Sequence, residues 1–404
     1  MDIGLEAIAF HTSRHYIDLS DLAIARGIEP EKFTIGLGQK KMAIASPIED
    51  TVYLAINAAK KALVKFNISP EEIGTLVVGT ETGVDHSKPV AVYIHQALGL
   101  PSNCITYETK HACFGAMAAM TSSGDWIASG RAKGRKALIV AADIANYAVG
   151  SAAEPTQGAG AVAMVVSDTP KLVKFNRDIN GYFTKNVMDF WRPLYAKEAF
   201  ADGHYSIQCY LEAMTETIAD AGPNLPNLEE FSACLYHVPF VKMATKAHMR
   251  HFEVDSNTEI TKESENFTSF RNSFKEKTEP WLNLNAEVGN IYTGSLFLSL
   301  INLLTSPNLP LDRPISLFSY GSGCAASMTS IQPIAGYHDW LAQFNPAKEL
   351  ESRKRLSVKE YEYFMEQREL QLGGDDQLKP SDWDVQGDYL YLGNKSHIRQ
   401  YLNL

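Results

Sequence analysis

Three long apolar runs constrain the fold of this chain more than any other feature. Residues 75–80, 137–143 and 158–166 consist mostly of Val, Leu, Ile, Ala and Gly, without the alternation of a half-exposed strand. Such runs are typical of strands buried on both faces, as in a sheet covered by helices. Segments with helical periodicity lie between them, at 51–63 and 89–98. Strands that alternate with helices predict an α/β sheet, in which chemistry collects at the carboxyl ends of strands and the amino ends of helices.

The second half of the chain shows a comparable alternation without repeating the sequence. We therefore expect two similar αβ halves, residues 1–168 and 169–404. Residues 345–404 are charged and hold one helical segment, so we expect a peripheral arm there. The elements expected in the second half are a helix at 206–221, a strand at 231–236, a long apolar helix at 288–304, a strand at 315–320 and a helix at 358–370.

Composition excludes several classes of partner. The formal net charge is −10 and no tract of Lys and Arg occurs, so we expect neither nucleic acid nor an anionic membrane surface as a partner. No stretch is apolar enough to span a bilayer, and the N-terminus lacks the pattern of a secretory signal. The five cysteines are scattered and show no metal-ligand spacing, so we expect no disulfide framework and no metal. These features predict a cytoplasmic protein in a reducing compartment.

Cys113 is the first candidate for chemistry. The mostly polar residues 109–112 precede it, and a run of small residues with helical character follows it to about Ser129. This places the thiol near a helix N-terminus, where unpaired N–H groups and the positive end of the dipole favour an anion. We therefore expect a lowered pKa for Cys113 and a thiolate nucleophile. The alternative is a buried, inert core thiol.

Glu81 and His237 follow predicted strands, at 75–80 and 231–236. A Cys–His pair with a carboxylate suits acyl transfer through a covalent thioester. Each residue also has a plainer interpretation, since a glutamate at a strand end often caps backbone and a histidine before Val-Pro is often structural. Spacing along the chain does not show that the three side chains meet.

Two further motifs have weaker implications. Residues 320–323 follow a strand, and their N–H groups are candidates for an oxyanion nest, although an ordinary tight turn has the same pattern. Lys242 and Lys246 lie four apart just after His237, which suits contact with a phosphorylated carrier or a solvated helix face. Gly158-Ala159-Gly160 lacks the third glycine of a dinucleotide fingerprint.

Taken together, the motifs resemble the 3-hydroxy-3-methylglutaryl-CoA synthase family over nearly the whole chain. Their order and even distribution make a chance match implausible. The matching segments are residues 36–39 (GLGQ), 79–85 (GTETGVD), 110–113 (KHAC), 154–165 (EPTQGAGAVAMV), 189–193 (DFWRP), 237–243 (HVPFVKM), 289–296 (GNIYTGSL) and 319–323 (SYGSG).

The resemblance implies a thiolase-type fold, with two similar αβ halves in five layers (αβαβα), and a homodimer. It implies a catalytic trio of Glu81, Cys113 and His237. It implies that Asn285 and Ser322 hold acyl groups and that Lys242, with Lys246 one turn further, approaches coenzyme A. The residues implied to line the acyl and pantetheine passage are Tyr147, Phe190, Pro239 and Phe240.

The activity implied is the condensation of acetyl-CoA with acetoacetyl-CoA in the mevalonate pathway to isoprenoids, with no cofactor beyond the CoA thioesters. Cys113 holds the acetyl group, Glu81 removes a proton from its methyl group, and His237 assists the alkoxide that forms. Removal of Glu81 is expected to block condensation while leaving acetylation of Cys113 largely intact.

Three alternatives stay open. A branch of the family acts on a β-ketoacyl chain held by an acyl-carrier protein, but that branch usually has Thr-Cys where this chain has Phe190-Trp191. A second alternative is a simpler condensing enzyme or thiolase. Those enzymes use a histidine or a second cysteine as the base, so the glutamate at position 81 argues against this alternative. A non-catalytic scaffold would not need the intact trio. Ser327, Asn146 and Phe114 also replace a glutamate, an arginine and a tyrosine that are common in the family, which bears on substrate detail more than on reaction type.

Overall fold

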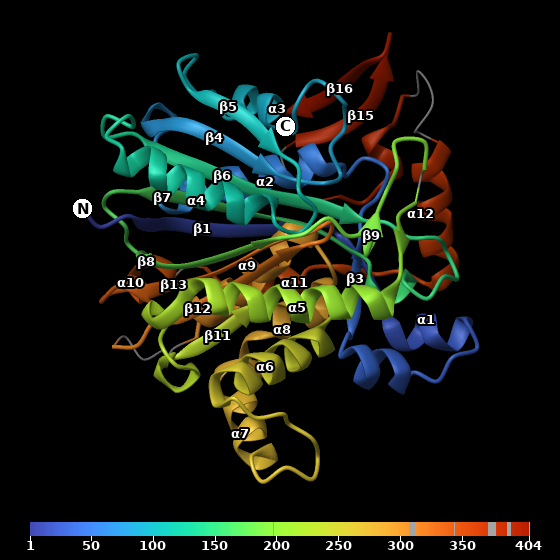
Figure 1. The fold of residues 1–404 in the computed structure, drawn as a ribbon. Helices are drawn as coiled ribbons and strands as arrows, with labels where there is room; N and C mark the ends of the chain where they lie inside the picture. The colour runs from blue at the N-terminus through green and yellow to red at the C-terminus, as the bar shows by residue number, and fades with distance from the viewer. Residues whose placement is uncertain (197, 307–311, 343, 371–376, 386–388, 404) are drawn as a thin grey trace.

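The computed structural model describes residues 1–404 except 197, 307–311, 343, 371–376, 386–388 and 404. The strands of its main sheet are β1 (Gly4–Thr12), β4 (Ile73–Gly79), β5 (Ile105–Thr109), β6 (Lys136–Ala145), β7 (Gly158–Ser167), β8 (Val173–Thr184), β11 (Ala233–Tyr236), β12 (Ile315–Gly321) and β13 (Ala325–Pro333). Among the described residues these nine strands form one mixed sheet, in the order β11-β12-β13-β8-β1-β7-β6-β4-β5 (Figure 1).

The three apolar runs form the strands predicted for them. β4 and β7 are buried at every position, and β6 is buried at every position but its first. β6 pairs with β4 on one side and with β7 on the other, so its backbone groups are satisfied inside the sheet. The predicted burial on both faces is therefore confirmed.

The two halves meet in the middle of the sheet. β1 belongs to the first half and β8 to the second, and they pair antiparallel at Gly4↔Lys174 and Leu5↔Val173. This short ladder makes the two sets of strands one hydrogen-bonded sheet.

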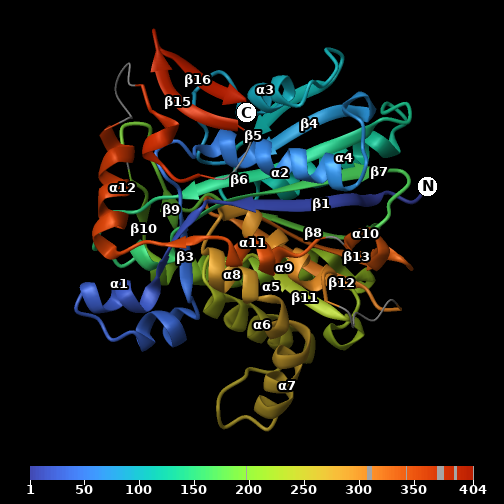
Figure 2. The same ribbon diagram turned by 180° about the vertical axis from the view of Figure 1, so that it is seen from behind.

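Helices cover the sheet in layers, as Figures 1 and 2 show from opposite sides. α2 and α3 lie on the outer face of the first half, and α5 and α6 lie on the outer face of the second. α4 and α9 lie between the strands of the two halves. This is the expected five-layered αβαβα arrangement. The bounds are α2 (Thr51–Lys65), α3 (Val90–Ala97), α4 (Gly115–Ala128), α5 (Gly203–Ala221), α6 (Val241–Ser256) and α9 (Ser295–Leu304).

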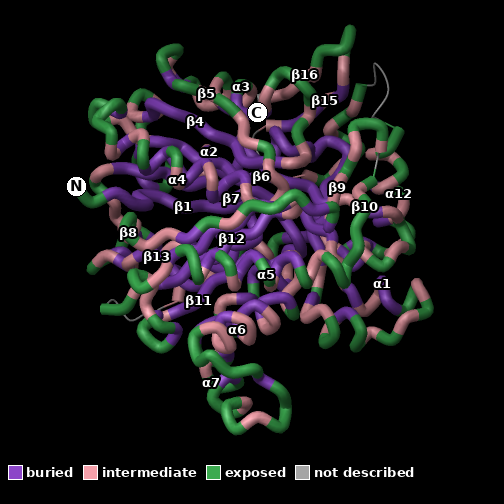
Figure 3. The backbone as a smooth tube through the Cα atoms, viewed as in Figure 1, coloured by how far each residue is buried: buried purple, intermediate pink, exposed green. Residues whose placement is uncertain are grey.

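The central helix α9 is the most deeply buried helix of the described structure. In α9 every residue is buried except Asn302. Figure 3 shows the same trend, with burial concentrated in the strands and central layer and exposure along α7 and the outer loops. The helices outside the five layers are α1 (Leu19–Ala25), α7 (Phe267–Lys277), α8 (Asn283–Val288), α10 (Tyr337–Leu341), α11 (Pro346–Glu351) and α12 (Val358–Leu370). Among the described residues, no helix combines the length and apolar character needed to cross a bilayer.

The apolar helix expected at 288–304 is wrong in its extent. α8 ends at Val288, the chain turns at Gly289 with φ of 88°, and α9 begins only at Ser295. A Cβ atom on Gly289 would lie 1.9 Å from the carbonyl oxygen of Gln157, so only glycine allows this approach. Apolar content alone does not reveal the break, because Ile291 and Tyr292 after it are also buried.

The C-terminal segment is integrated into the first half and is not a peripheral arm. β14 (Lys354–Arg355) adds a parallel strand to β2 (His15–Asp18), which pairs with β3 (Lys41–Ile44). On α12, Tyr361 is fully buried. The hairpin of β15 (Tyr389–Lys395) and β16 (Ile398–Asn403) reaches Asp50, the N-cap of α2, through Arg399 and Tyr401. The charged residues along this segment suggested that it is exposed to solvent. Several of these residues instead form ion pairs with the first half.

Candidate active site

Cys113 lies two residues before α4, on the loop that follows β5. The end of β4 presses against the start of this helix, since a Cβ on Gly79 would lie 2.4 Å from the Ala116 nitrogen. The Ala116 N–H donates to Thr293 Oγ1 at 2.8 Å, which ties the helix start to the second half. The predicted position of Cys113 near a helix N-terminus is therefore confirmed.

The expected thiolate is wrong. Burial raises the pKa of Cys113 well above its usual value, and the negative charges of Glu81, Asp143 and Asp189 raise it further. Loss of hydration and three nearby carboxylates outweigh the favourable end of the helix dipole, which is worth only about 0.3–2 kcal/mol. Cys113 is a neutral thiol in the resting site.

Glu81 lies two residues after β4, and its carboxyl is within electrostatic reach of the Cys113 sulfur. Burial raises the pKa of Glu81 to about 8, the charge of Asp143 adds to this rise, and Arg192 opposes it. Arg192 also donates from Nη2 to the Glu81 carbonyl oxygen at 2.7 Å. The site thus holds a carboxyl that loses its proton only near neutral or mildly basic pH.

Asp143 is a buried partner of Glu81 that the sequence analysis did not single out. Its Oδ1 accepts from the Thr80 and Thr82 hydroxyls, at 2.9 and 2.8 Å, and from the backbone N–H groups of Glu81 and Thr82, at 3.0 and 3.1 Å. Its Oδ2 is buried without a partner among the described residues. Asp143 lies within β6, near the carboxyl end, so the strand-end rule that selected Glu81 was also the available signal for Asp143.

His237 follows β11 directly and is 2% exposed. Its N–H donates to the Phe318 carbonyl at 2.8 Å, and its own carbonyl accepts from the Tyr210 hydroxyl at 2.9 Å. Burial lowers the pKa of His237 to about 3, so the imidazole is neutral at physiological pH. Its Nδ1 is buried and has no partner among the described residues.

Packing brings the strands that carry these groups together. β12 lies beside β11, with Phe318 opposite Tyr236. A Cβ at Gly321, the end of β12, would lie 2.7 Å from both the His111 carbonyl oxygen and the Phe114 nitrogen. Tyr210, whose hydroxyl donates to the His237 carbonyl, has its pKa raised by burial and by its proximity to Cys113. The second half therefore packs the end of β12, the strand beside β11, against the loop of Cys113.

An aromatic wall borders the thiol. Cys113 and Phe190 pack against the cluster of Tyr147 and Tyr292. The Phe190 ring lies 6.3 Å from the Tyr147 ring and 6.1 Å from that of Tyr292, between centroids. Burial raises the pKa of Tyr147, so its hydroxyl keeps its proton, and Tyr292 and Asn290 are close enough to affect that pKa. The predicted residues Tyr147 and Phe190 thus lie beside Cys113, while Tyr292 and Asn290 next to them were not singled out from the sequence.

Ser322 lies on the turn after β12, which Asp189 anchors. Asp189 accepts from the Tyr320 hydroxyl at 2.6 Å and from the Gly323 N–H at 2.9 Å. One N–H of the nest considered at 320–323 is therefore engaged within the protein. Asp189 is fully buried and was not singled out from the sequence.

Asn285 does not offer its amide to a ligand. Its Nδ2 donates to the Ser295 carbonyl at 2.8 Å and its Oδ1 accepts from the Ser299 hydroxyl at 2.9 Å. These bonds join α8 to α9, so the role that the structure gives Asn285 is to hold two helices together. Asn290, five residues on, is the amide that neighbours Tyr147.

The predicted coenzyme A residues lie at the start of α6. Pro239 and Phe240 are half-buried just before the helix, and Lys242 is exposed on its first turn. Lys246 follows one turn later and is half-buried. Both lysines are therefore accessible from the His237 end of the helix.

The three departures from the family pattern have different surroundings. Phe114 places its ring 5.9 Å from that of His111. The Asn146 Oδ1 and the Ser327 Oγ are buried atoms without a partner among the described residues. Asn146 directly precedes Tyr147, whereas Ser327 lies on β13 opposite Ser319.

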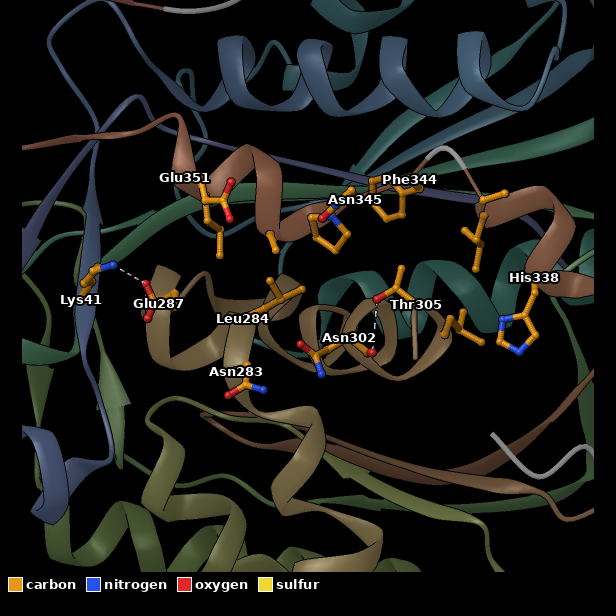
Figure 4. Close-up of a pocket in the computed structure, with 16 residues that line it drawn as sticks. Lys41, Asn283, Leu284, Glu287, Asn302, Thr305, His338, Phe344, Asn345 and Glu351 are labelled. Carbon is orange, nitrogen blue, oxygen red and sulfur yellow. Dashed lines mark hydrogen bonds and ion pairs between the residues drawn. The ribbon is translucent and has the colours of Figure 1, made fainter. Parts of the chain in front are cut away.

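A separate cavity lies away from these residues. It has a volume of about 700 Å³ and lies between α8, α9 and α11, with Lys41 and Glu287 ion-paired at 2.8 Å at one end and His338 at the other (Figure 4). None of the predicted site residues lines it. Among the described residues, no group of three His, Cys, Asp or Glu side chains is placed to hold a metal ion.

Comparisons with known proteins agree with this geometry. The family model described as "Hydroxymethylglutaryl-coenzyme A synthase N terminal" matches residues 1–171, and the corresponding C-terminal model matches residues 173–272 and 255–401. The hydroxymethylglutaryl-CoA synthase of Enterococcus faecalis is 36% identical over 365 residues, which cover 90% of this chain and 91% of that protein.

Solved structures give the same result. MvaS in complex with 3-hydroxy-3-methylglutaryl coenzyme A superposes with a TM-score of 0.92 at 38% identity, over 100% of this chain and 99% of that chain. The HMG synthase of the curacin biosynthetic pathway, in complex with apo donor-ACP, superposes with a TM-score of 0.91 at 28% identity over 100% of both chains. The fold, the residues gathered around Cys113 and these matches along its whole length show that the chain belongs to the hydroxymethylglutaryl-CoA synthase family.

Proposed function

We propose that this protein condenses acetyl-CoA with acetoacetyl-CoA, through an acetyl group held on Cys113, to form 3-hydroxy-3-methylglutaryl-CoA. The observation that carries this proposal is that the Glu81 carboxyl lies within electrostatic reach of the Cys113 thiol, while the second half packs the end of β12, the strand beside β11, against the loop of Cys113. Membership of the family and the similarity to MvaS with its bound product support the same reaction.

The first step forms the acetyl-enzyme. Because Cys113 is a neutral thiol, it passes its proton to a base as the sulfur attacks the acetyl thioester carbonyl. The neutral imidazole of His237 takes that proton in the proposal. The bond to the CoA sulfur breaks, and CoA leaves as a free thiol once it regains a proton.

The second step makes the carbon–carbon bond. A thioester carbonyl is weakly stabilised by resonance, so its α-protons are comparatively acidic. Glu81 removes one of them, and its raised pKa makes its carboxylate a stronger base than an ordinary glutamate. The enolate carbon attacks the ketone carbon of acetoacetyl-CoA, whose oxygen becomes an alkoxide. A hydrogen bond from His237 stabilises the alkoxide until it is protonated.

The third step releases the product. Water adds to the thioester carbonyl on Cys113, the carbon–sulfur bond breaks, and the sulfur regains its proton. The former acetyl carbonyl leaves as a carboxylate. In the proposal, Ser322 helps to hold the acyl groups and the aromatic wall of Tyr147 and Phe190 borders the passage. Pro239, Phe240, Lys242 and Lys246 receive the pantetheine and phosphate portion.

The proposal includes the context of the enzyme. We place the reaction in the mevalonate pathway to isoprenoid precursors, with CoA thioesters as substrates and no separate cofactor. The five cysteines are all free, which fits the reducing cytoplasm.

We also propose a homodimer built on the free edge of β5. β5 is the last strand of the main sheet and pairs only with β4 among the described residues. Its Ile105 and Tyr107 side chains are 51% and 38% exposed. An exposed edge strand with apolar side chains is a template for pairing with another chain, and a second copy satisfies both edges by symmetry. β5 leads directly into the Cys113 loop, so this interface would brace the nucleophile.

The choice of acceptor carrier gives the main test. Labelled acetyl-CoA is offered with acetoacetyl groups either on CoA or on an acyl-carrier protein, and product formation is followed. We expect efficient turnover with acetoacetyl-CoA. This chain is 38% identical to MvaS and 28% identical to the curacin enzyme, which supports the free CoA thioester. Preference for the carrier protein would show that the polyketide branch is the correct function.

Glu81→Gln should separate the two half-reactions. Loss of the base should slow condensation by about 10²–10⁴-fold, because one positioned general base accelerates a reaction by a factor of this size. Acetylation of Cys113, measured as label retained on the protein, should persist. Cys113→Ala serves as the control that abolishes retention. Condensation at an undiminished rate in Glu81→Gln would assign the base to another residue.

Asp143→Asn should shift the pH profile of condensation to lower pH. Condensation requires ionised Glu81, so kcat should rise with pH through the raised pKa of about 8. Removing the Asp143 charge lowers the pKa of Glu81, because the like charge no longer opposes ionisation. Asparagine keeps the Oδ1 acceptor and replaces only the unpartnered Oδ2. A profile that does not move would exclude this coupling.

Charged side chains on β5 should separate the dimer. The double variant Ile105→Lys/Tyr107→Lys should have a mass near the 44.7 kDa of one chain, whereas the natural protein should have twice that mass. Sedimentation equilibrium measures both. Ile24→Lys, at a residue of α1 that is 68% exposed, is the matched control. A natural protein that sediments as a monomer would refute the homodimer.

A further inference from the structure

A chain of buried hydrogen bonds links the C-terminal helix α12 to the aromatic wall of the active site. It starts at Arg26, the C-cap of α1, whose Nε and Nη2 donate to the two Glu154 carboxylate oxygens at 2.9 and 2.8 Å. Tyr361 of α12 lies 3.1 Å from Glu154 Oε1 and 2.8 Å from Gln157 Nε2. Gln157 Oε1 lies 2.9 Å from the backbone nitrogen of Tyr147. Three segments far apart in the sequence, around Arg26, at 147–157 and around Tyr361, thus meet behind Tyr147.

The direction of each bond follows from its neighbour. Glu154, paired in a bidentate manner with Arg26, only accepts, so the Tyr361 hydroxyl donates to it. The Tyr361 oxygen is then free to accept from the Gln157 amide nitrogen. That orientation turns the Gln157 oxygen toward Tyr147, where it accepts from the N–H. If the direction of one of these hydrogen bonds were reversed, two donors or two acceptors would face each other at the next bond.

Burial makes this chain rigid. Tyr361, Glu154 and Gln157 are 0%, 1% and 2% exposed, so water does not compete for their hydrogen bonds. Burial also raises the pKa of Tyr361, which keeps its donated proton in place. Arg26 has a second anchor on α12, since its Nη1 donates to Glu362 at 2.7 Å.

The same segment also adjoins a neighbour of the Tyr147 hydroxyl. Directly after Gln157, Gly158 forms a β-bridge with Gly289. The next residue, Asn290, lies close enough to Tyr147 to lower the pKa of its hydroxyl, against the rise caused by burial. Gln157 therefore holds the backbone N–H of Tyr147, and the bridge at Gly158 holds the segment that carries Asn290.

We propose that Tyr361 is a positioning residue for the condensation, acting through Gln157 on Tyr147. The C-terminal helix is thereby part of the support of the active site, and it touches no substrate. This inference rests on the proposed function, because its readout is that reaction. It assigns to residues 345–404 a role that their charged sequence did not suggest.

The test is Tyr361→Phe, which keeps the buried ring and removes only the hydroxyl. Loss of the chain should lower kcat by about tenfold, since displacement of a catalytic group by a fraction of an ångström has effects of this order. KM for acetyl-CoA should be little changed, because Lys242 and Lys246 lie elsewhere. Tyr363→Phe on the same helix, where the ring is 51% exposed, should behave as the natural protein.

A double-variant cycle distinguishes positioning from a general loss of structure. If Tyr361 acts through Tyr147, its replacement should change kcat little further in a Tyr147→Phe background, so the two effects are not additive. If Tyr361→Phe does not fold, Glu154→Gln interrupts the same chain from its other end. Unchanged kcat in a folded variant, or effects that multiply, would overturn the inference. Absence of turnover in the natural protein would instead refute the proposed function.

Discussion

Loss of hydration is the physical constraint on which the site depends. Burial raises the pKa of Cys113 and Glu81 and lowers that of His237, so the dominant effect at each group is the same. The resting site therefore holds a neutral thiol and a neutral imidazole, and not a preformed thiolate–imidazolium pair. Asp143 fixes the local structure around Glu81, because its Oδ1 accepts hydrogen bonds from the Thr80 and Thr82 hydroxyls and from the Glu81 N–H.

Close backbone approaches set the packing around this point. Gly79 lets β4 meet the start of α4, and Gly289 lets the α8–α9 connection meet Gln157 and Gly158, where β7 begins. Each contact leaves no room for a side chain, so the spacing of layers is set by backbone. The strands before Glu81 and His237, β4 and β11, are buried along their length, which restricts the motion of these two residues, whereas β5 before Cys113 is an exposed edge strand.

The C-terminal segment shows how function extends beyond the two halves. It contributes a strand to β2, a hairpin against α2 and a helix whose tyrosine reaches the support of Tyr147. Several of its charged residues form ion pairs with the first half, such as Glu362 with Arg26 and Arg399 with Asp50. The same charges that make a segment look solvated also allow it to dock.

The amino-acid sequence by itself determined the class of fold and the positions of Glu81, Cys113 and His237 at element ends. Apolar runs and helical periodicity are local, so they survive without tertiary information. Only the tertiary structure decided which polar groups are buried together, and this reversed the expected ionisation of Cys113 and gave Asn285 a role between helices. It also revealed Asp143, Asp189, Tyr292, Asn290 and Tyr361, whose partners are distant in the sequence. The reason is that desolvation and hydrogen-bond partners depend on neighbours in space, and local patterns contain no record of them.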